Sequence, residues 1–352
     1  MVDEKDIYDI TFVGAGPVAL FGAYYAGFRH MKVKLIDTMP DLGGQVTALY
    51  PEKEIFDVAG FPMVLGKDLV KNLVKQGLQY GATVCLEEKV QKYKRLEEKL
   101  FEVETDKGTH YTRTICLTVG LGTITPRPMG HPSEARLMGK GVAYCVKNLD
   151  AFRGKEMFVI GGGDSAFDWV LMLRPVAKKV WMVHRRDGFR AHEDSVKKVV
   201  GDPAVEKKLF YEVKDIHGQD KVEGITIFDN RTKKEETYPA DGVILSLGFI
   251  SSLGPIAEWG LETIGKSLVV NTRMETNVQG IYAAGDCVEF DGKLRLIATG
   301  FGEAAMAVCQ AKHWIDPKSQ VFPGHSSSIM EEKKEKEKLA ARKAEQAKAA
   351  TH

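Results

Sequence analysis

The chain has 352 residues, of which 44% are hydrophobic and 28% charged, and its 49 Lys and Arg nearly balance its 48 Asp and Glu. At roughly 150 residues per domain, this length suggests about two domains, and the apolar content excludes global disorder. The net charge of +1 excludes the strongly basic surface of a general nucleic-acid binder. No apolar run approaches the ~18 residues of a membrane-spanning helix, so we expect no membrane association.

The first element is an apolar strand pattern at residues 10–13 that runs into a glycine-rich turn and a helix pattern. Gly14, Gly16 and Ala19 fit the spacing GxGxxA, in which the glycines allow a tight turn and close approach of a pyrophosphate. The next strand pattern ends at Asp37, 21 residues after Gly16, where a carboxylate can accept hydrogen bonds from ribose hydroxyls. Together these features predict a dinucleotide-binding site.

Residues 83–118 differ from this alternation of strand and helix, because short β-like runs are broken by Lys and Gly. They predict a small antiparallel meander, and residues 224–248 predict a similar one. The remaining strand and helix signals predict a parallel sheet with crossover helices.

A second glycine motif follows the strand pattern at residues 157–160, and it begins 147 residues after Gly14. This motif, which also fits GxGxxA, predicts a second nucleotide site whose candidate residues are Gly161, Gly163, Asp164 and Ser165.

The offset of 21 residues from this motif falls on a histidine and not on an acid. The strand ends in a cationic cluster made of His184, Arg185, Arg186 and Arg190. Guanidinium groups bind phosphate in a bidentate manner, and an acid there would repel it. The cluster therefore predicts the 2′-phosphate of NADPH, and a solvated run of charge is the alternative.

Two late segments suggest that the first dinucleotide is FAD. Residues 280–288 form a strand pattern that ends in Gly285 and Asp286, and this carboxylate can bind a ribityl hydroxyl of a flavin. Residues 296–308 begin a glycine-rich helix whose amides and dipole favour negative charge on a reduced flavin. A simple turn and an ordinary packed helix are the alternatives.

The two glycine motifs, Asp37, the cationic cluster and the segment GIYAAGD together resemble the thioredoxin-reductase-like flavoprotein disulfide reductases, over residues 7–328. The resemblance implies an α/β fold with two Rossmann-like three-layer nucleotide-binding domains, the NADPH domain being inserted in a discontinuous FAD domain. The implied FAD domain spans residues 1–120 and 247–330, and the NADPH domain spans 121–246. A charged, disordered or helical tail follows at 331–352.

The thiols depart from this resemblance. Thioredoxin reductases carry a CxxC pair shortly before the second glycine motif, where this chain has only Cys145. A related reductase carries its single cysteine in the first glycine motif, where this chain has Val18. The five cysteines form no CxxC pair and no metal-like spacing with histidine, so we expect reduced thiols, a cytoplasmic location and no metal site.

A chain with two nucleotide sites and no dithiol resembles the thioredoxin-reductase-like ferredoxin–NADP+ reductases. In that family the residues that match Gln45 and Tyr50 bind FAD and stack on its ring, and those that match Val90 and Ile124 make backbone contacts with it. Val18 also lies at the implied FAD site. A core aromatic or core apolar role is the alternative for Tyr50, Val90 and Ile124.

The same resemblance extends to residues 325–328, HSSS, near the end of the chain. It implies that His325 covers the opposite face of the flavin, from the partner protomer of a homodimer, and that Ser327 contacts the flavin. A surface histidine is the alternative.

The implied function is electron transfer between NADPH and ferredoxin or flavodoxin, by hydride transfer to FAD and one-electron steps through a semiquinone. FAD carries this chemistry, so no catalytic residue is required, and no Ser/His/Asp or Cys/His set is recognisable. An acidic carrier would dock in a salt-sensitive manner. The alternatives are a flavoprotein disulfide reductase, a flavin-bound sensor or scaffold without enzymatic activity, and an NADPH:quinone or diaphorase activity.

Overall fold

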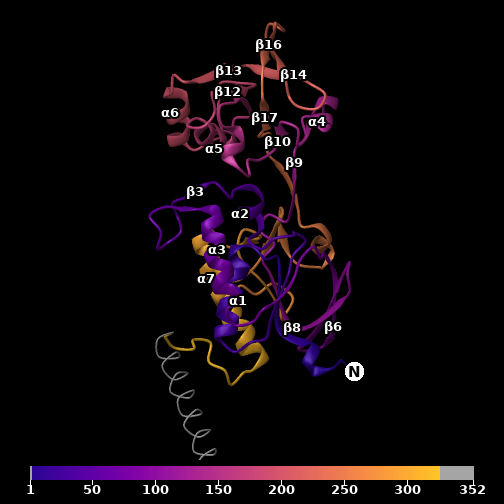
Figure 1. Ribbon diagram of the computed structural model, residues 1–352. Coiled ribbons are helices and arrows are strands. Elements are labelled where there is room, and N and C mark those ends of the chain that lie inside the picture. Colours follow the sequence, from indigo (N-terminus) through magenta and orange to yellow (C-terminus); the bar gives the residue numbers. More distant parts are fainter. Residues whose placement is uncertain (1, 326–352) are drawn as a thin grey trace, which may run out of the picture.

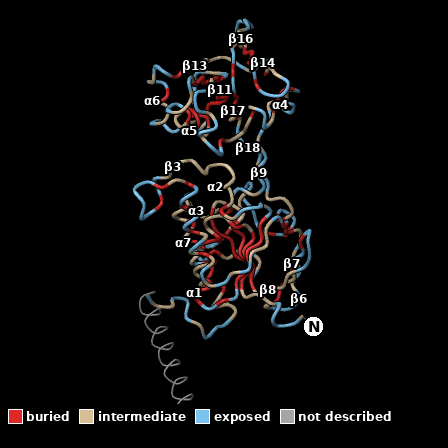
Figure 2. The backbone as a smooth tube through the Cα atoms, in the orientation of Figure 1, coloured by how far each residue is buried: buried red, intermediate tan, exposed pale blue. Residues whose placement is uncertain are grey.

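The structure is a computed structural model that describes residues 2–325, and its chain forms two lobes (Figure 1). Ser327 and the predicted charged tail at 331–352 lie outside the described residues. In both lobes the buried residues concentrate on the central strands, and exposed residues lie on the loops and outer helices (Figure 2).

The first lobe is built on a mixed sheet in the order β5-β2-β1-β8-β7-β6, with β21 also paired to β8. Strands β5, β2, β1, β8 and β21 are parallel, whereas β6, β7 and β8 form an antiparallel meander. The strands are β1 (Ile7–Val13), β2 (Val33–Ile36), β5 (Thr83–Cys85), β6 (Val90–Glu97), β7 (Leu100–Thr105), β8 (Thr109–Leu117) and β21 (Ile281–Ala283). The predicted meander is thus present, but its first run, β5, joins the parallel part of the sheet.

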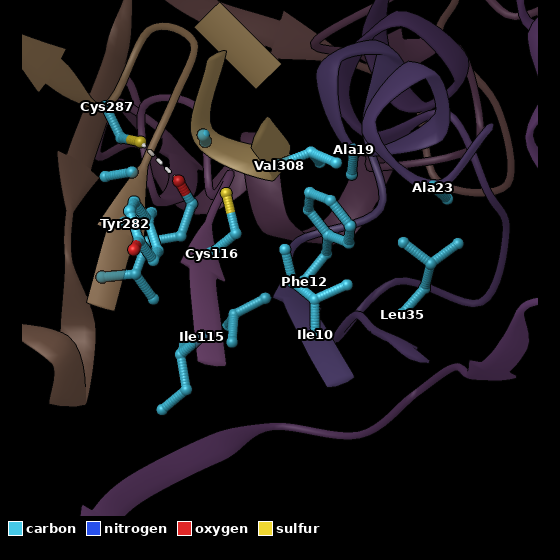
Figure 3. Packing of buried hydrophobic residues seen from close by; sticks show 14 of the residues in the cluster. Ile10, Phe12, Ala19, Ala23, Leu35, Ile115, Cys116, Tyr282, Cys287 and Val308 are labelled. Carbon is cyan, nitrogen blue, oxygen red and sulfur yellow. Dashed lines mark hydrogen bonds between the residues drawn. The ribbon is translucent and has the colours of Figure 1, made fainter. Parts of the chain in front are cut away.

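Helices cover one face of this sheet (Figure 1). They are α1 (Pro17–Phe28), α3 (Gly66–Gly77) and α7 (Ile297–Ile315), and α1 packs against the other two. Close packing requires small residues on α1, since a Cβ atom at Gly22 would lie 2.6 Å from the ring of Phe12. Ala19, Ala23 and Val308 surround the same buried ring, with Cys116 and Cys287 in the adjoining core (Figure 3).

The second lobe contains a parallel sheet in the order β10-β17-β11-β12-β13. Beside it lie the antiparallel strands β14, β15 and β16 and three helices. The strands are β10 (Val142–Ala143), β11 (Glu156–Ile160), β12 (Lys179–His184), β13 (Val205–Leu209), β14 (Tyr211–His217), β15 (Gly224–Asp229), β16 (Glu235–Pro239) and β17 (Gly242–Leu245), and the helices are α4 (Pro132–Leu137), α5 (Asp164–Leu173) and α6 (Glu193–Gly201). The meander predicted at 224–248 is present in part, because β17 is fully buried and belongs to the parallel sheet.

The chain passes between the lobes twice, on strands that pair with each other. Strand β9 (Thr123–Pro126) leaves the first lobe and is antiparallel to β18 (Phe249–Ser252), on which the chain returns. The second lobe is therefore inserted in the first, and the fold is α/β with two Rossmann-like lobes. The domain limits predicted at 120/121 and 246/247 fall just before these two strands and stay predictions.

Short elements complete the described chain. Helix α2 (Gly44–Leu49) and the hairpin of β3 (Glu54–Ile55) and β4 (Val64–Leu65) lie between β2 and α3, and β19 (Thr263–Ile264), β20 (Ser267–Val269) and β22 (Val288–Glu289) form a small sheet. Three 3₁₀ helices lie at Glu4–Asp6, Leu149–Phe152 and Gly254–Glu258. None of the helices within residues 2–325 combines the length and apolarity needed to cross a membrane.

Candidate functional site

A cavity of about 430 Å³ opens at the carboxyl edge of the first sheet, within the usual size range of cofactor sites. The parallel strands β1, β2, β8 and β21 all end there, which is where ligands bind in folds of this kind. Most of the residues predicted for FAD line this cavity, namely Gly14, Gly16, Val18, Asp37, Gln45, Tyr50, Val90 and Asp286.

The first glycine turn has the geometry that its sequence predicts. Gly14 has a φ of +95°, and a Cβ atom there would lie 2.6 Å from the carbonyl oxygen of Thr118. Gly16 precedes α1 and has an ordinary extended φ, and no atom lies within 4 Å of the place that its Cβ would take. Gly14 is thus required by the fold itself, whereas Gly16 leaves open space at the positive end of α1, where a phosphate binds well.

Asp37 holds the turn in place from the neighbouring strand. One carboxylate oxygen accepts a hydrogen bond from the backbone N–H of Ala15 at 2.5 Å, and the other accepts from the N–H of Met39 at 2.8 Å. Each carboxylate oxygen retains a further lone pair for a ligand hydroxyl. This arrangement is compatible with the predicted ribose contact.

Helix α2 carries Gln45 and Tyr50 to the cavity. Its start crosses the first glycine turn closely, because the N–H of Gly43 donates to the carbonyl of Ala15 at 2.9 Å. A Cβ atom at Gly44 would lie 3.0 Å from the Cα atom of Gly16. Tyr50 ends the helix, and its side chain also packs against the core of the second lobe.

A buried polar cluster beside the cavity is not predicted by the sequence motifs. Glu88 lines the cavity and accepts hydrogen bonds from Thr105 and from the His110 ring, both at 2.6 Å. Burial raises the pKa of Glu88, but these hydrogen bonds outweigh burial and leave it below its ordinary value. Lys34 contacts the other His110 nitrogen at 2.7 Å, so the cluster is internally satisfied.

The second glycine motif closes a turn against the loop that follows β12. A Cβ atom at Gly161 would lie 2.3 Å from the carbonyl oxygen of Ser246, and Gly163 is the N-cap residue of α5. The N–H of Arg190 donates to the carbonyl of Gly162 at 2.8 Å, which fixes the loop over the turn. Asp164 accepts a hydrogen bond from the backbone N–H of His192 at 2.8 Å.

The cationic cluster divides into a buried and an exposed part. His184 is buried, its ring lies against Gly162 and contacts the carbonyl of Gly188 at 3.2 Å, and burial lowers its pKa. Contact of His184 with a phosphate therefore stays a prediction.

The arginines of the cluster present free guanidinium groups. No carboxylate within residues 2–325 pairs with Arg185, Arg186 or Arg190, and Arg185 and Arg190 are exposed. The Nε atom of Arg186 is buried, and no acceptor among the described residues reaches it. A buried donor without an acceptor costs free energy, which an anion that accepts a hydrogen bond from this atom would recover. The Nε atom is therefore suited to bind an anion.

The lobes touch where the two nucleotide motifs approach each other. Tyr50 of the first lobe and Ser165 and Trp169 of α5 line a space of about 10 Å³, room for about one water molecule. Lys53 and Asp168 form an ion pair of 2.6 Å across the same junction. This space is too small for a nicotinamide ring.

Three predicted FAD residues are not placed in the cavity. Ile124 lies on β9, where its backbone pairs with Ser251. His325 is exposed and contacts Phe322, with ring centroids 5.7 Å apart, and it does not line the cavity. Ser327 lies outside the described residues. Their contacts with FAD stay predictions.

The sequence matches the pyridine nucleotide-disulphide oxidoreductase family over residues 8–311. The chain belongs to this family. A curated relative within it, "Ferredoxin--NADP reductase 2" of Shouchella clausii, is 48% identical over 94% of this chain and 100% of its own. "Ferredoxin--NADP reductase" of Symbiobacterium thermophilum is 50% identical over 93% and 98%. These relatives confirm the resemblance that the motifs indicate.

Solved structures support the same family fold. Thioredoxin reductase from T. acidophilum matches with a TM-score of 0.74 and 26% identity, over 89% of this chain and 100% of its own. Thioredoxin reductase from Lactococcus lactis matches with a TM-score of 0.73 and 24% identity, over 88% and 99%, which supports the fold alone.

Proposed function

We propose that this chain is an FAD-dependent oxidoreductase that passes electrons between NADPH and ferredoxin. The curated relatives named ferredoxin–NADP reductase support this function, because they match almost the whole chain at close to half identity. The residues at the two glycine motifs fit the cofactors. Space is left open at Gly16, and a buried guanidinium nitrogen lacks an acceptor at Arg186.

The observation that carries the choice of acceptor is the state of the thiols. All five cysteines lie within residues 2–325 and all are free. Cys145, the thiol nearest to the second glycine motif in sequence, lies 3.8 Å from the carbonyl of Ala48, and burial raises its pKa. A reductase that passes electrons through a dithiol requires two neighbouring cysteines and a reactive thiolate. Cys116 and Cys287 lie near each other, but both are fully buried in the core and burial raises the pKa of each, so neither supplies a reactive thiolate. We therefore infer that the electrons leave the flavin for an external carrier.

In the first lobe, Gly14, Gly16 and the start of α1 would hold the FAD pyrophosphate, and Asp37 would bind its ribose. Gln45, Tyr50, Val90 and Asp286 would contact the flavin half, with Val18 packed beneath it and Ile124 contributing its backbone. When bound, FAD supplies the exchange between two-electron and one-electron chemistry.

In the second lobe, Gly161, Gly163, Asp164 and Ser165 would hold the pyrophosphate of NADPH. The cluster of His184, Arg185, Arg186 and Arg190 would bind its 2′-phosphate. In the present arrangement the Tyr50 side chain and the Lys53–Asp168 ion pair close the junction between the lobes, so we infer that the lobes move apart when the nicotinamide reaches the flavin.

We further propose that the protein is a cytoplasmic homodimer that also accepts flavodoxin. Arg29, at the end of α1 far from the cavity, donates to the carbonyl oxygens of Gln320 and Val321 at 2.5 and 2.9 Å. His325 is therefore held away from the cavity of its own chain, which supports the proposal that it and Ser327 serve the flavin of a partner. Five free thiols are typical of a reducing compartment.

The proposal is tested by supplying the protein with NADPH and two acceptors under anaerobic conditions. One reaction contains ferredoxin coupled to cytochrome c, and the other contains thioredoxin with a thiol reagent. We expect reduction of cytochrome c that depends on ferredoxin, falls with added salt, and is accompanied by no thioredoxin turnover. Thioredoxin turnover without ferredoxin coupling would instead establish a disulfide reductase.

A further inference from the structure

A buried ion pair lies behind the turn that carries Asp286. The ammonium of Lys293 contacts one carboxylate oxygen of Glu303 at 2.5 Å, and the two side chains are only 0% and 4% exposed. The other oxygen of Glu303 accepts a hydrogen bond from the backbone N–H of Gly285 at 2.7 Å. The carboxylate is thus shared between a buried cation and the turn next to the cavity.

The pair lies beside two segments of the cavity wall. Gly285 and Asp286 line the cavity from the end of β21, and Leu296 and Ile297 line it from the start of α7. Lys293 belongs to the loop before α7, and Glu303 lies in the second turn of that helix.

Packing leaves this region little freedom to adjust. A Cβ atom at Gly300 would lie 2.5 Å from the side chain of Val18 and 3.6 Å from the Cα atom of Gly285, so α7 lies directly on the turn. On its other side, the thiol of Cys287 donates to the carbonyl of Leu117 at 3.3 Å within the core (Figure 3). The turn is therefore fixed both by the core and by the Glu303 carboxylate.

Stability alone is a weak reason for such a pair. Removing two charges from water costs free energy that their attraction only partly recovers, and apolar residues of similar volume often serve as well. A role in the cavity accounts for the pair better, because its hydrogen bond reaches the backbone that presents Asp286.

We propose that Glu303 and Lys293 are positioning residues for the flavin. Glu303 holds the Gly285–Asp286 turn at the geometry that binds FAD, and Lys293 neutralises the carboxylate so that no net charge lies behind the flavin. This inference rests on the proposed function, because it requires FAD in the cavity.

The test measures the FAD dissociation constant and the midpoint potential of bound FAD at pH 7. Glu303→Gln leaves the Lys293 cation unpaired and should raise the potential, whereas Lys293→Met leaves the Glu303 anion unpaired and should lower it. We expect each shift to equal about a tenfold change in the relative affinities for reduced and oxidised FAD, about 30 mV for a two-electron couple. The double variant should return close to the parent potential.

Glu303→Asp provides a readout that does not depend on removing a buried charge. The aspartate keeps the negative charge, but its side chain is shorter by one methylene and does not reach the backbone N–H of Gly285. FAD affinity should therefore fall at least tenfold. The matched control is Glu289→Gln, which breaks the exposed Arg295–Glu289 pair of the same region and should change neither quantity.

The outcomes separate this inference from the proposed function. If the parent protein binds no FAD, the proposed function fails. If the parent binds FAD and Glu303→Asp binds it equally well, or the two single variants shift the potential in the same direction or not at all, the pair merely stabilises the fold and the inference is overturned.

Discussion

The free guanidinium groups after β12 make the choice between NADPH and NADH a quantitative prediction. Arg186 is half-buried and its Nε atom lacks an acceptor among the described residues, so its bond to a phosphate should be worth about 1.5–3 kcal/mol. At about 1.4 kcal/mol per factor of ten, Arg186→Ala should raise the KM for NADPH about 10- to 150-fold. Arg185 is exposed, so Arg185→Ala should contribute about 0.2–1 kcal/mol, at most about fivefold.

The assay is steady-state reduction of ferricyanide with either nucleotide, using the single and double variants. The KM for NADH should change less than about threefold, because NADH has no 2′-phosphate to lose. Arg174→Ala is the control, since Arg174 lies at the other end of α5 and is already paired with Asp202. Equal increases in KM for the two nucleotides would refute the assignment of the arginines to the phosphate.

Three further predictions concern the fold and its junction. Gly14→Ala should destabilise the apoprotein by more than about 1 kcal/mol, because the φ of Gly14 is positive. Gly16→Ala should leave thermal unfolding unchanged but weaken FAD binding at least tenfold, because the space at Gly16 is open. Equal effects of the two variants on stability would contradict this contrast. Lys53→Met should raise the population of separated lobes up to about fivefold, because it removes the ion pair with Asp168. Replacing Asp168 should have the same effect. An unchanged fluorescence energy transfer between the lobes would refute this prediction. Burial lowers the pKa of His184 in the folded protein below its ordinary value of 6.5, so on acidification the unfolded state binds the proton before the folded state does. The free energy of unfolding should therefore fall as the pH drops below 6.5. His184→Gln should make this free energy, measured with denaturant, less dependent on pH in that range.

Local sequence signals predict the parts of the molecule that depend on local geometry. The two glycine turns and the position of Asp37 at the end of a strand follow from spacings of a few residues, and the structure has both features. The meander limits are less accurate, because the apolar run that becomes β17 is buried on both faces and joins the parallel sheet. A short apolar run alone does not distinguish these two placements.

The ion pairs at the site depend on tertiary contacts that the spacing of residues in the sequence does not predict. Lys53 and Asp168 are 115 residues apart, and in sequence they resemble ordinary surface charges. Lys293 and Glu303 resemble a solvated loop and helix face, although their side chains are almost fully buried. His184 belongs to a cationic run, but its place at the end of a buried strand turns its ring inward. In each case burial, which the motifs do not report, determines the role of the charge.

The most direct test of the central claim is an anaerobic titration of the protein with NADPH, followed by flavin absorbance. A disulfide reductase stores two electrons in its flavin and two in its dithiol, whereas this chain offers only the flavin. We predict complete bleaching with one equivalent of NADPH per FAD, unchanged in the Cys145→Ser variant. Uptake of two equivalents, with one lost in that variant, would mean that Cys145 takes part in a redox-active disulfide and that the electrons do not leave directly from FAD.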